Sequence, residues 1–398
     1  MTSLYDKRGV SAQKEEVHAA ISHLDAGLYP YAFCKMYADT IGADADFVNI
    51  MHADGAGTKS ILAYLYWKET GDISVWRGIA QDAIAMNLDD LLCVGVYTNV
   101  LFSSTIDRNK NRIPGDVLKE VIEGSRLFFE SMKSHGVDIA ILGGETADVG
   151  DVVRTIAVNG TMMARWPKAK IITNEKIDAG QVIVGFSSFG KANYETAYNS
   201  GLGSNGLTSA RHDVLAKYYA EKYPETYEGL LHDDVIYIGN KKLTDAVWVH
   251  WQQLQKQYSE ETNIGSLLLS PTRTYAPLLK QLLTEEFEHL YGIIHCSGGG
   301  QTKCMKYLPR PLKIVKNNLF DTPLIFQIIQ QNSGADMKEM MQVFNMGHRL
   351  EIFTNEASAE RLIQVAASFG IDAKIIGHTV ASSNKSLHIL HEGKEVIF

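Results

Sequence analysis

The sequence contains few cysteines and no long hydrophobic run, and each absence makes a class of protein less plausible. The four cysteines, Cys34, Cys93, Cys296 and Cys304, show no Cys-x-x-Cys spacing. No segment approaches the unbroken apolar length that spanning a bilayer requires, and the first residues lack the apolar core of a secretory signal. We therefore expect a cytoplasmic protein in a reducing compartment, with no membrane role.

The chain also lacks an excess of basic residues. Its net charge is −8, and no basic stripe is interleaved with aromatic residues, which argues against nucleic acid as a partner. Phosphorylated small molecules must then be captured by local sites and not by a global positive field. The hydrophobic fraction of 45% and the charged fraction of 21% are typical of a soluble globular protein.

A chain of 398 residues is too long for one ordinary core, so we expect two domains with a cleft between them. Strand-like and helical patterns alternate in the first half, which predicts an α/β or α+β fold. A boundary at Trp166-Pro167 would give domains 1–170 and 171–398. The expected strands are 94–102, 139–142, 152–158, 291–295 and 350–353, with one more starting after 179–180, and the expected helices are 75–92, 115–135, 208–223 and 275–283.

Residues 54–60 read Asp-Gly-Ala-Gly-Thr-Lys-Ser and join an apolar run to a helical pattern. Paired glycines let backbone N–H groups close around phosphate oxygens, and the N-terminus of the following helix adds positive partial charge. Lys59 would add a full charge, and Asp54 could hold a divalent cation. This is not a Walker A loop, because Thr58 separates Gly57 from Lys59. The stretch is either a nucleotide-binding loop or only a glycine-rich turn.

Three aspartates, Asp82, Asp89 and Asp90, lie in a helical segment. Positions seven apart fall within about 20° of each other around a helix, so Asp82 and Asp89 should share a face with Asp90 at its flank. Such carboxylates either face water or hold a cation such as Mg²⁺. Glu145, in Gly143-Gly-Glu-Thr, would lie at the end of another strand, comparable to Asp54.

The second half contains two glycine clusters, 201–206 and 297–300, whose default interpretation is a tight loop. His295 precedes the second cluster and is either structural or catalytic. Arg211 and Thr272-Arg273 are candidate partners for an anion, although surface salt bridges explain most arginines equally well.

Taken together, these motifs resemble the aminoimidazole ribonucleotide synthetase family, also called phosphoribosylformylglycinamidine cyclo-ligases. The similarity runs through nearly the whole chain and rests on ordered motifs. These are Tyr5-Asp-Lys-Arg-Gly-Val, Asp54-Gly-Ala-Gly-Thr-Lys, Ala85-Met-Asn-Leu-Asp-Asp-Leu, Gly143-Gly-Glu-Thr-Ala-Asp, Ser204-Asn-Gly, Ser270-Pro-Thr-Arg-Thr-Tyr, His295-Cys-Ser-Gly-Gly-Gly and Phe344-Asn-Met-Gly.

The resemblance implies an N-terminal half that forms a β-barrel across a homodimer, and a C-terminal α/β half. It also implies a reaction in purine biosynthesis. ATP would phosphorylate the amide oxygen of formylglycinamidine ribonucleotide, and an internal nitrogen would then close the imidazole ring and release phosphate.

The resemblance further implies a set of site residues, with ATP and Mg²⁺ as cofactors and a ribonucleotide as substrate. His295, Lys59 and Asp90 would be catalytic. ATP would contact Asp54, Gly55, Gly57, Thr58, Lys59 and Glu145, the substrate would contact Ser204, Asn205, Arg211, Thr272, Gly298 and Gly299, and Mg²⁺ would be held by Asp54, Asp82 and Asp90.

Several positions depart from the family pattern. Gly203 stands where the family has the histidine of His-Ser-Asn-Gly, and Asp89 replaces an asparagine. Segments 29–33 and 95–104 are altered, and 191–202 lengthens the loop before Gly203. A non-catalytic ATP-binding homologue and a related ATP-dependent enzyme with another substrate therefore remain alternatives.

Overall fold

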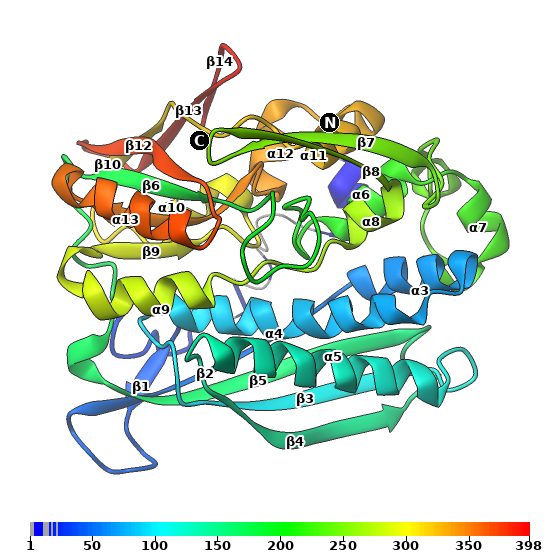
Figure 1. The fold of residues 1–398 in the computed structure, drawn as a ribbon, viewed down its shortest axis with the longest axis horizontal. Coiled ribbons are helices and arrows are strands. Elements are labelled where there is room, and N and C mark those ends of the chain that lie inside the picture. The colour runs from blue at the N-terminus through cyan, green and yellow to red at the C-terminus, as the bar shows by residue number, and fades with distance from the viewer. Residues whose placement is uncertain (1–3, 11–15, 17–18, 21–22) are drawn as a thin grey trace.

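The first half of the chain folds as an open five-stranded sheet covered by helices on one face (Figure 1). The computed structural model describes residues 4–10, 16, 19–20 and 23–398. The strand order is β1-β2-β5-β3-β4, in which β3 and β4 are parallel and the other neighbours antiparallel. The elements are α1 (Leu4–Lys7), β1 (Met36–Ala38), β2 (Phe47–Gly55), α3 (Lys59–Thr70), α4 (Trp76–Leu92), β3 (Val100–Arg108), α5 (Gly115–Ser134), β4 (Ile139–Asp148) and β5 (Ile156–Pro167).

The second half is built on a seven-stranded mixed sheet of order β14-β13-β10-β12-β6-β11-β9, with β7 and β8 as a separate hairpin. Its strands are β6 (Val182–Ser187), β7 (Ala246–Gln253), β8 (Lys256–Asn263), β9 (Gly292–His295), β10 (Leu312–Lys316), β11 (His348–Thr354), β12 (Ala373–Ala381), β13 (Ser386–His391) and β14 (Lys394–Ile397). Its helices are α6 (Leu207–Val214), α7 (Tyr218–Lys222), α8 (Ile264–Leu269), α9 (Ala276–Glu285), α10 (Lys303–Lys306), α11 (Leu324–Ser333), α12 (Met337–Val343) and α13 (Glu356–Ser368).

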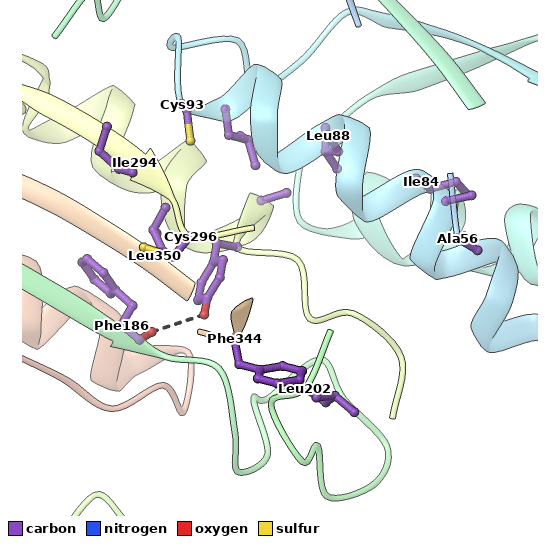
Figure 2. Close-up of a cluster of buried hydrophobic side chains, with 14 of the residues drawn as sticks. Ala56, Ile84, Leu88, Cys93, Phe186, Leu202, Ile294, Cys296, Phe344 and Leu350 are labelled. Atoms are coloured by element: carbon purple, nitrogen blue, oxygen red, sulfur yellow. Dashed lines mark hydrogen bonds between the residues drawn. The ribbon is translucent and has the colours of Figure 1, made fainter. Parts of the chain in front are cut away.

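Helix α4 lies at the centre of the molecule, between the five-stranded sheet and the second half (Figure 1). It packs on β2, β5 and α5 on one side and on α9 on the other. Because it is enclosed, 14 of its 17 residues are buried, including its three aspartates. Figure 2 shows Ile84 and Leu88 of α4 in one cluster with Phe186 of β6 and Leu350 of β11. The buried charges of α4 therefore face the contact between the two halves.

Most expected elements are present, and the differences have local causes. Helices 75–92 and 115–135 are confirmed as α4 and α5. The strand expected from residue 94 begins only at Val100, because Gly95 and Asn99 have φ of 94° and 56°, which a strand does not adopt. The helix expected over 208–223 is two helices, since Leu215 has extended dihedrals and ends α6.

The strand expected over 139–142 continues to Asp148, because β4 pairs with β3 as far as Arg108. Gly143, Gly144 and Glu145 are therefore inside a strand and not at its end.

Neither large sheet closes into a barrel within the described residues, so the barrel across a dimer stays a prediction. The proposed division at residue 170 also stays a prediction. The described residues contain no helix that is both long and apolar enough to cross a bilayer.

Candidate functional site

The glycine loop connects the end of β2 to the start of α3. Gly57 has a φ of 57°, and a Cβ there would meet no atom within 4 Å, so the loop is open on that side. A Cβ on Gly55 would lie 2.1 Å from Oδ1 of Asn159, so only glycine lets β2 approach β5 so closely. The N-termini of α3 and α6 lie side by side, with 2.8 Å between the hydroxyl oxygens of Thr58 and Thr208. Neither N-terminus has a side-chain cap. Their backbone N–H groups can therefore receive an anion.

Lys59 does not point into this loop. Its ammonium donates to Oδ1 of Asp82 at 2.9 Å and to the backbone oxygen of Ser270 at 2.6 Å, and both charged side chains are fully buried. Burial lowers the pKa of Lys59, and Asp82 opposes that shift. Lys59 and Asp82 thus form an internal ion pair that connects α3, α4 and the segment following α8.

Asp82 and Asp89 share a face of α4, as the helical spacing predicts, and both bind the loop before α9. Oδ1 of Asp82 accepts from the backbone N–H and hydroxyl of Thr272 at 2.7 and 2.6 Å. Asp89 accepts from the hydroxyl of Thr274 at 2.5 Å, and burial raises the pKa of Asp89. The hydroxyl of Ser204 lies 3.0 Å from that of Thr272. The common partner of these two carboxylates is a protein loop.

Asp90 lies between two histidines. Its Oδ1 is 2.6 Å from Nδ1 of His295, and its Oδ2 is 3.1 Å from Nε2 of His52 on β2. Burial alone would raise the pKa of Asp90, but the two imidazoles outweigh it and lower the pKa below its usual value. Asp90 therefore remains a carboxylate.

His52 carries a proton on each ring nitrogen. The amide nitrogen of Asn87 lies within 3.1 Å of the backbone oxygens of Asp54, Ala83 and Gly160, so the amide oxygen of Asn87 must accept from Nδ1 of His52, at 3.0 Å. Nε2 donates to Asp90. Burial alone would lower the pKa of His52, but Asp90 chiefly raises it, to about 9. His52 is therefore an imidazolium at neutral pH.

Both ring nitrogens of His295 also have protein partners. Nε of Arg349 can only donate, and it lies 3.0 Å from Nε2 of His295, which must accept. Nδ1 then carries the proton and donates to Asp90. The side chain of His295 is fully buried with both ring nitrogens occupied. In this arrangement it has no nitrogen left for a substrate proton.

Sequence reasoning missed His52 and Arg349. A period-two interpretation could have found His52, because residues two apart on a strand point to the same side, and Asp54 was already a candidate. Arg349 had no such local signal. Its role follows only from the contact between β11 and β9.

Other expected residues are distributed unevenly. The side chain of Asn205 lies near Gly298, where a Cβ would be 3.5 Å from the amide nitrogen of Asn205, and Gly299 follows with a φ of 97°. Arg211 is buried and donates to the backbone oxygen of Thr226 at 2.5 Å and to the hydroxyl of Tyr237 at 3.1 Å, so it acts inside the second half.

Glu145 is exposed on β4. It is in register with Thr105, Asn159 and Gly55, three strands from the glycine loop. That separation is about 14 Å at the usual strand spacing. Within one chain, Glu145 is not part of the cluster around α4.

The three aspartates expected to hold Mg²⁺ do not come together as one group. In the part of the chain that the structure describes, the one set of three potential ligands within 4.8 Å is Cys296, His348 and Glu351. Glu351 already accepts from the ammonium of Lys316 and from His348. Lys316 and His348 lower the pKa of Glu351 to about 2 against the effect of burial. The negative charge of Glu351 is therefore already balanced by the ammonium of Lys316.

Both oxygens of Asp90 and one oxygen of Asp82 are bonded to protein groups. Asp54 accepts from the backbone N–H of Gly55 at 2.7 Å and is exposed beside the glycine loop. Mg²⁺ in nucleotide sites commonly keeps several waters and needs only one or two carboxylates in addition to phosphates. Asp54 fits that requirement best.

Comparison with known proteins identifies relatives of this chain. The family model described as "AIR synthase related protein, N-terminal domain" matches residues 37–166. The phosphoribosylformylglycinamidine cyclo-ligase of Thermococcus gammatolerans is 32% identical over 76% of this chain and 70% of its own length. That of Pyrococcus furiosus is 31% identical over 78% of this chain and 73% of its own length.

The fold also resembles a solved structure, AaThiL complexed with AMPPCP and TMP, with a TM-score of 0.53 and 10% identity over 96% of this chain and 93% of that one. This likeness concerns the fold alone. Because the sequence similarity to the cyclo-ligases extends through both halves and includes the glycine loop, the aspartate helix and His295, the chain belongs to the phosphoribosylformylglycinamidine cyclo-ligase family, whose members are ATP-dependent ligases.

Proposed function

We propose that this protein uses ATP to close formylglycinamidine ribonucleotide into aminoimidazole ribonucleotide in de novo purine biosynthesis. Membership of the cyclo-ligase family supports the reaction. The observation that carries it is the pair of uncapped helix N-termini at Thr58 and Thr208, which meet beside the glycine loop. Such a pair can hold phosphate groups without a Walker A lysine.

The chemistry needs activation of a poor leaving group. An amide oxygen leaves readily only after it has become a phosphate ester. The internal nitrogen of the substrate can then attack the activated carbon, which closes the ring and releases phosphate. The protein has to position the two reactants and stabilise the charge that develops. The backbone N–H groups of Gly57 and Thr58, and those of Leu207 and Thr208 at the start of α6, would bind the transferred phosphate.

We propose other roles for two of the residues that the sequence analysis expected to be catalytic. Lys59 is bonded to Asp82, so we assign this pair to holding the glycine loop against Thr272. Both ring nitrogens of His295 are bonded to protein groups, so we assign the catalytic role expected of it to the imidazolium of His52. His52 contacts the same Asp90, and its side chain is partly exposed. The proposed contacts to the substrate are still Ser204, Asn205, Thr272, Gly298 and Gly299.

Mg²⁺ would be held by Asp54 together with the nucleotide phosphates. When bound, the ion would neutralise phosphate charge. Asp90 would stabilise the imidazolium of His52, and Asp82 would stay with Lys59.

We also propose a homodimer formed through the uncovered face of the five-stranded sheet. Met163 of β5 lies between Met51 of β2 and Leu101 of β3 in the sheet register. Met51 and Leu101 are 65% and 37% exposed, so an apolar row faces solvent on this side of the sheet. Exposed apolar patches commonly mark an interface with another protein chain. The neighbouring edge strand β4 is exposed along most of its length, and its pairing with another chain would cover it.

The location in a reducing cytoplasm stays a prediction. It is consistent with the four cysteines, all of which are free and buried.

The decisive experiment measures ADP release after formylglycinamidine ribonucleotide is added to the purified protein with ATP and Mg²⁺. Substrate-dependent ADP release together with formation of the imidazole product supports the proposal. ATP binding without turnover would instead indicate a nucleotide-binding homologue that has lost the reaction. ADP release with a different amide substrate only would indicate a related enzyme.

A further inference from the structure

Arg349, on β11, has a guanidinium that the protein uses only in part. The residue is 2% exposed. Its Nε donates to His295 at 3.0 Å, its Nη2 donates to the backbone oxygen of Arg273, and its Cζ lies 5.7 Å from the centre of the Tyr275 ring. Nη1 has no hydrogen-bond partner among the described residues. A buried N–H group without an acceptor is unfavourable, so this nitrogen needs an explanation.

The positive charge of Arg349 acts on the buried carboxylate of Asp89 but has no carboxylate in direct contact. The neighbouring buried Arg273 pairs with the carboxylate of Glu195 at 2.5 Å, whereas Arg349 makes no ion pair with any residue that the structure describes. Lys59, whose charge acts on the same region, is already bonded to Asp82. A buried cation without a counter-ion destabilises a protein. An anion beside Arg349 would supply the direct ion pair that the described residues do not make with it.

The unpartnered nitrogen faces Gly203. A Cβ added to Gly203 would lie 3.0 Å from Nη1, and the three atoms nearest to it all belong to Arg349. Gly203 has a φ of 73°, which glycine adopts easily. The resemblance places a histidine of the family at this position. A side chain at position 203 would lie directly against Nη1, whereas glycine places none there. The next two residues, Ser204 and Asn205, are half-buried.

We propose that Arg349 binds a phosphate oxygen in the cleft, in place of the histidine that the family carries at position 203. The proposal rests on the proposed function and names a ligand group for the same site. A guanidinium stays charged at every working pH and matches the geometry of phosphate oxygens. The phosphate is either that of the ribonucleotide or the group transferred from ATP, and the two sources are separable by experiment.

The test compares two variants that act on the same nitrogen by different routes. Arg349→Gln removes the charge, and Gly203→Ala places a methyl group against Nη1 while keeping the charge. The probes are ribose 5-phosphate and AMPPCP, with dissociation constants measured by calorimetry. We expect both variants to weaken the same probe by about ten- to one-hundredfold, as loss of a hydrogen bond to a charged group does. The control is Arg361→Gln at an exposed ion pair, which should change neither constant.

Weaker binding of ribose 5-phosphate assigns Arg349 to the phosphate of the ribonucleotide, and weaker binding of AMPPCP assigns it to the transferred group. The proposal is overturned if folded Arg349→Gln binds both probes as the wild type does. It is also overturned if only Arg349→Gln weakens binding, because Arg349 would then act through His295.

Should Arg349→Gln fail to fold, Arg349→Lys keeps the positive charge but lacks the planar set of N–H donors of a guanidinium. It must then bind the affected probe more weakly than the wild type, and unchanged binding overturns the proposal. A wild type that binds ribose 5-phosphate but releases no ADP with formylglycinamidine ribonucleotide contradicts the proposed function alone.

Discussion

The buried pair of Lys59 and Asp82 makes a stability prediction that separates its structural role from a direct role in catalysis. Both side chains are fully buried, and removal of one partner from such a pair commonly costs about 3–5 kcal/mol. Lys59→Met leaves Asp82 with two donors from Thr272, so we expect the lower limit, about 3 kcal/mol. Asp82→Asn leaves the ammonium with the oxygen of Ser270 and no counter-ion, so we expect about 5 kcal/mol.

The assay is unfolding in urea, followed by far-UV circular dichroism, on both single variants and on the double variant. The double variant leaves no unpaired charge, so it should be more stable than the sum of the single effects implies, by about 2–3 kcal/mol. Lys222→Met is the matched control, because Lys222 pairs with Glu69 at the surface and its loss should change the free energy of unfolding far less than loss of Lys59 does. A coupling energy below about 0.5 kcal/mol between Lys59 and Asp82 would refute the reasoning.

Three further predictions concern the cleft and the sheet. The pKa of His52 is about 9 in the folded protein against 6.5 in the unfolded chain, so its stabilisation is complete below pH 6.5 and disappears as pH rises through 9. The urea midpoint should therefore fall over that range in the wild type and stay nearly level in His52→Gln, and parallel curves would contradict this. Asp90→Ala should abolish Mg²⁺-dependent ADP release, because it removes the carboxylate that His52 and His295 share, and retained turnover would refute its assignment. Met163→Glu places a charge in the proposed dimer interface and should halve the mass measured by light scattering, with Lys222→Met as the control; an unchanged mass would exclude this interface.

Local patterns in the sequence were sufficient for the parts of the site that depend on neighbouring residues. The turn from β2 to α3, the two long helices of the first half and the shared face of Asp82 and Asp89 all follow from glycine placement and a period of 3.6 residues. The family resemblance extended this to the fold class and the reaction. These features are short-range, so a single sequence encodes them.

Only the tertiary structure decided which charges meet. Asp90 and His295 are 205 positions apart, and no local rule could show that His52 would take the other oxygen of Asp90. The sequence motifs and the family resemblance suggested a lysine beside phosphate, a metal group of three aspartates and a catalytic histidine. Burial of α4 between the two halves required a partner for each of its carboxylates, and those partners came from strands and loops distant in the chain. The sequence by itself determined the local motifs and the fold class, and packing determined which of the candidate side chains remain available for a ligand.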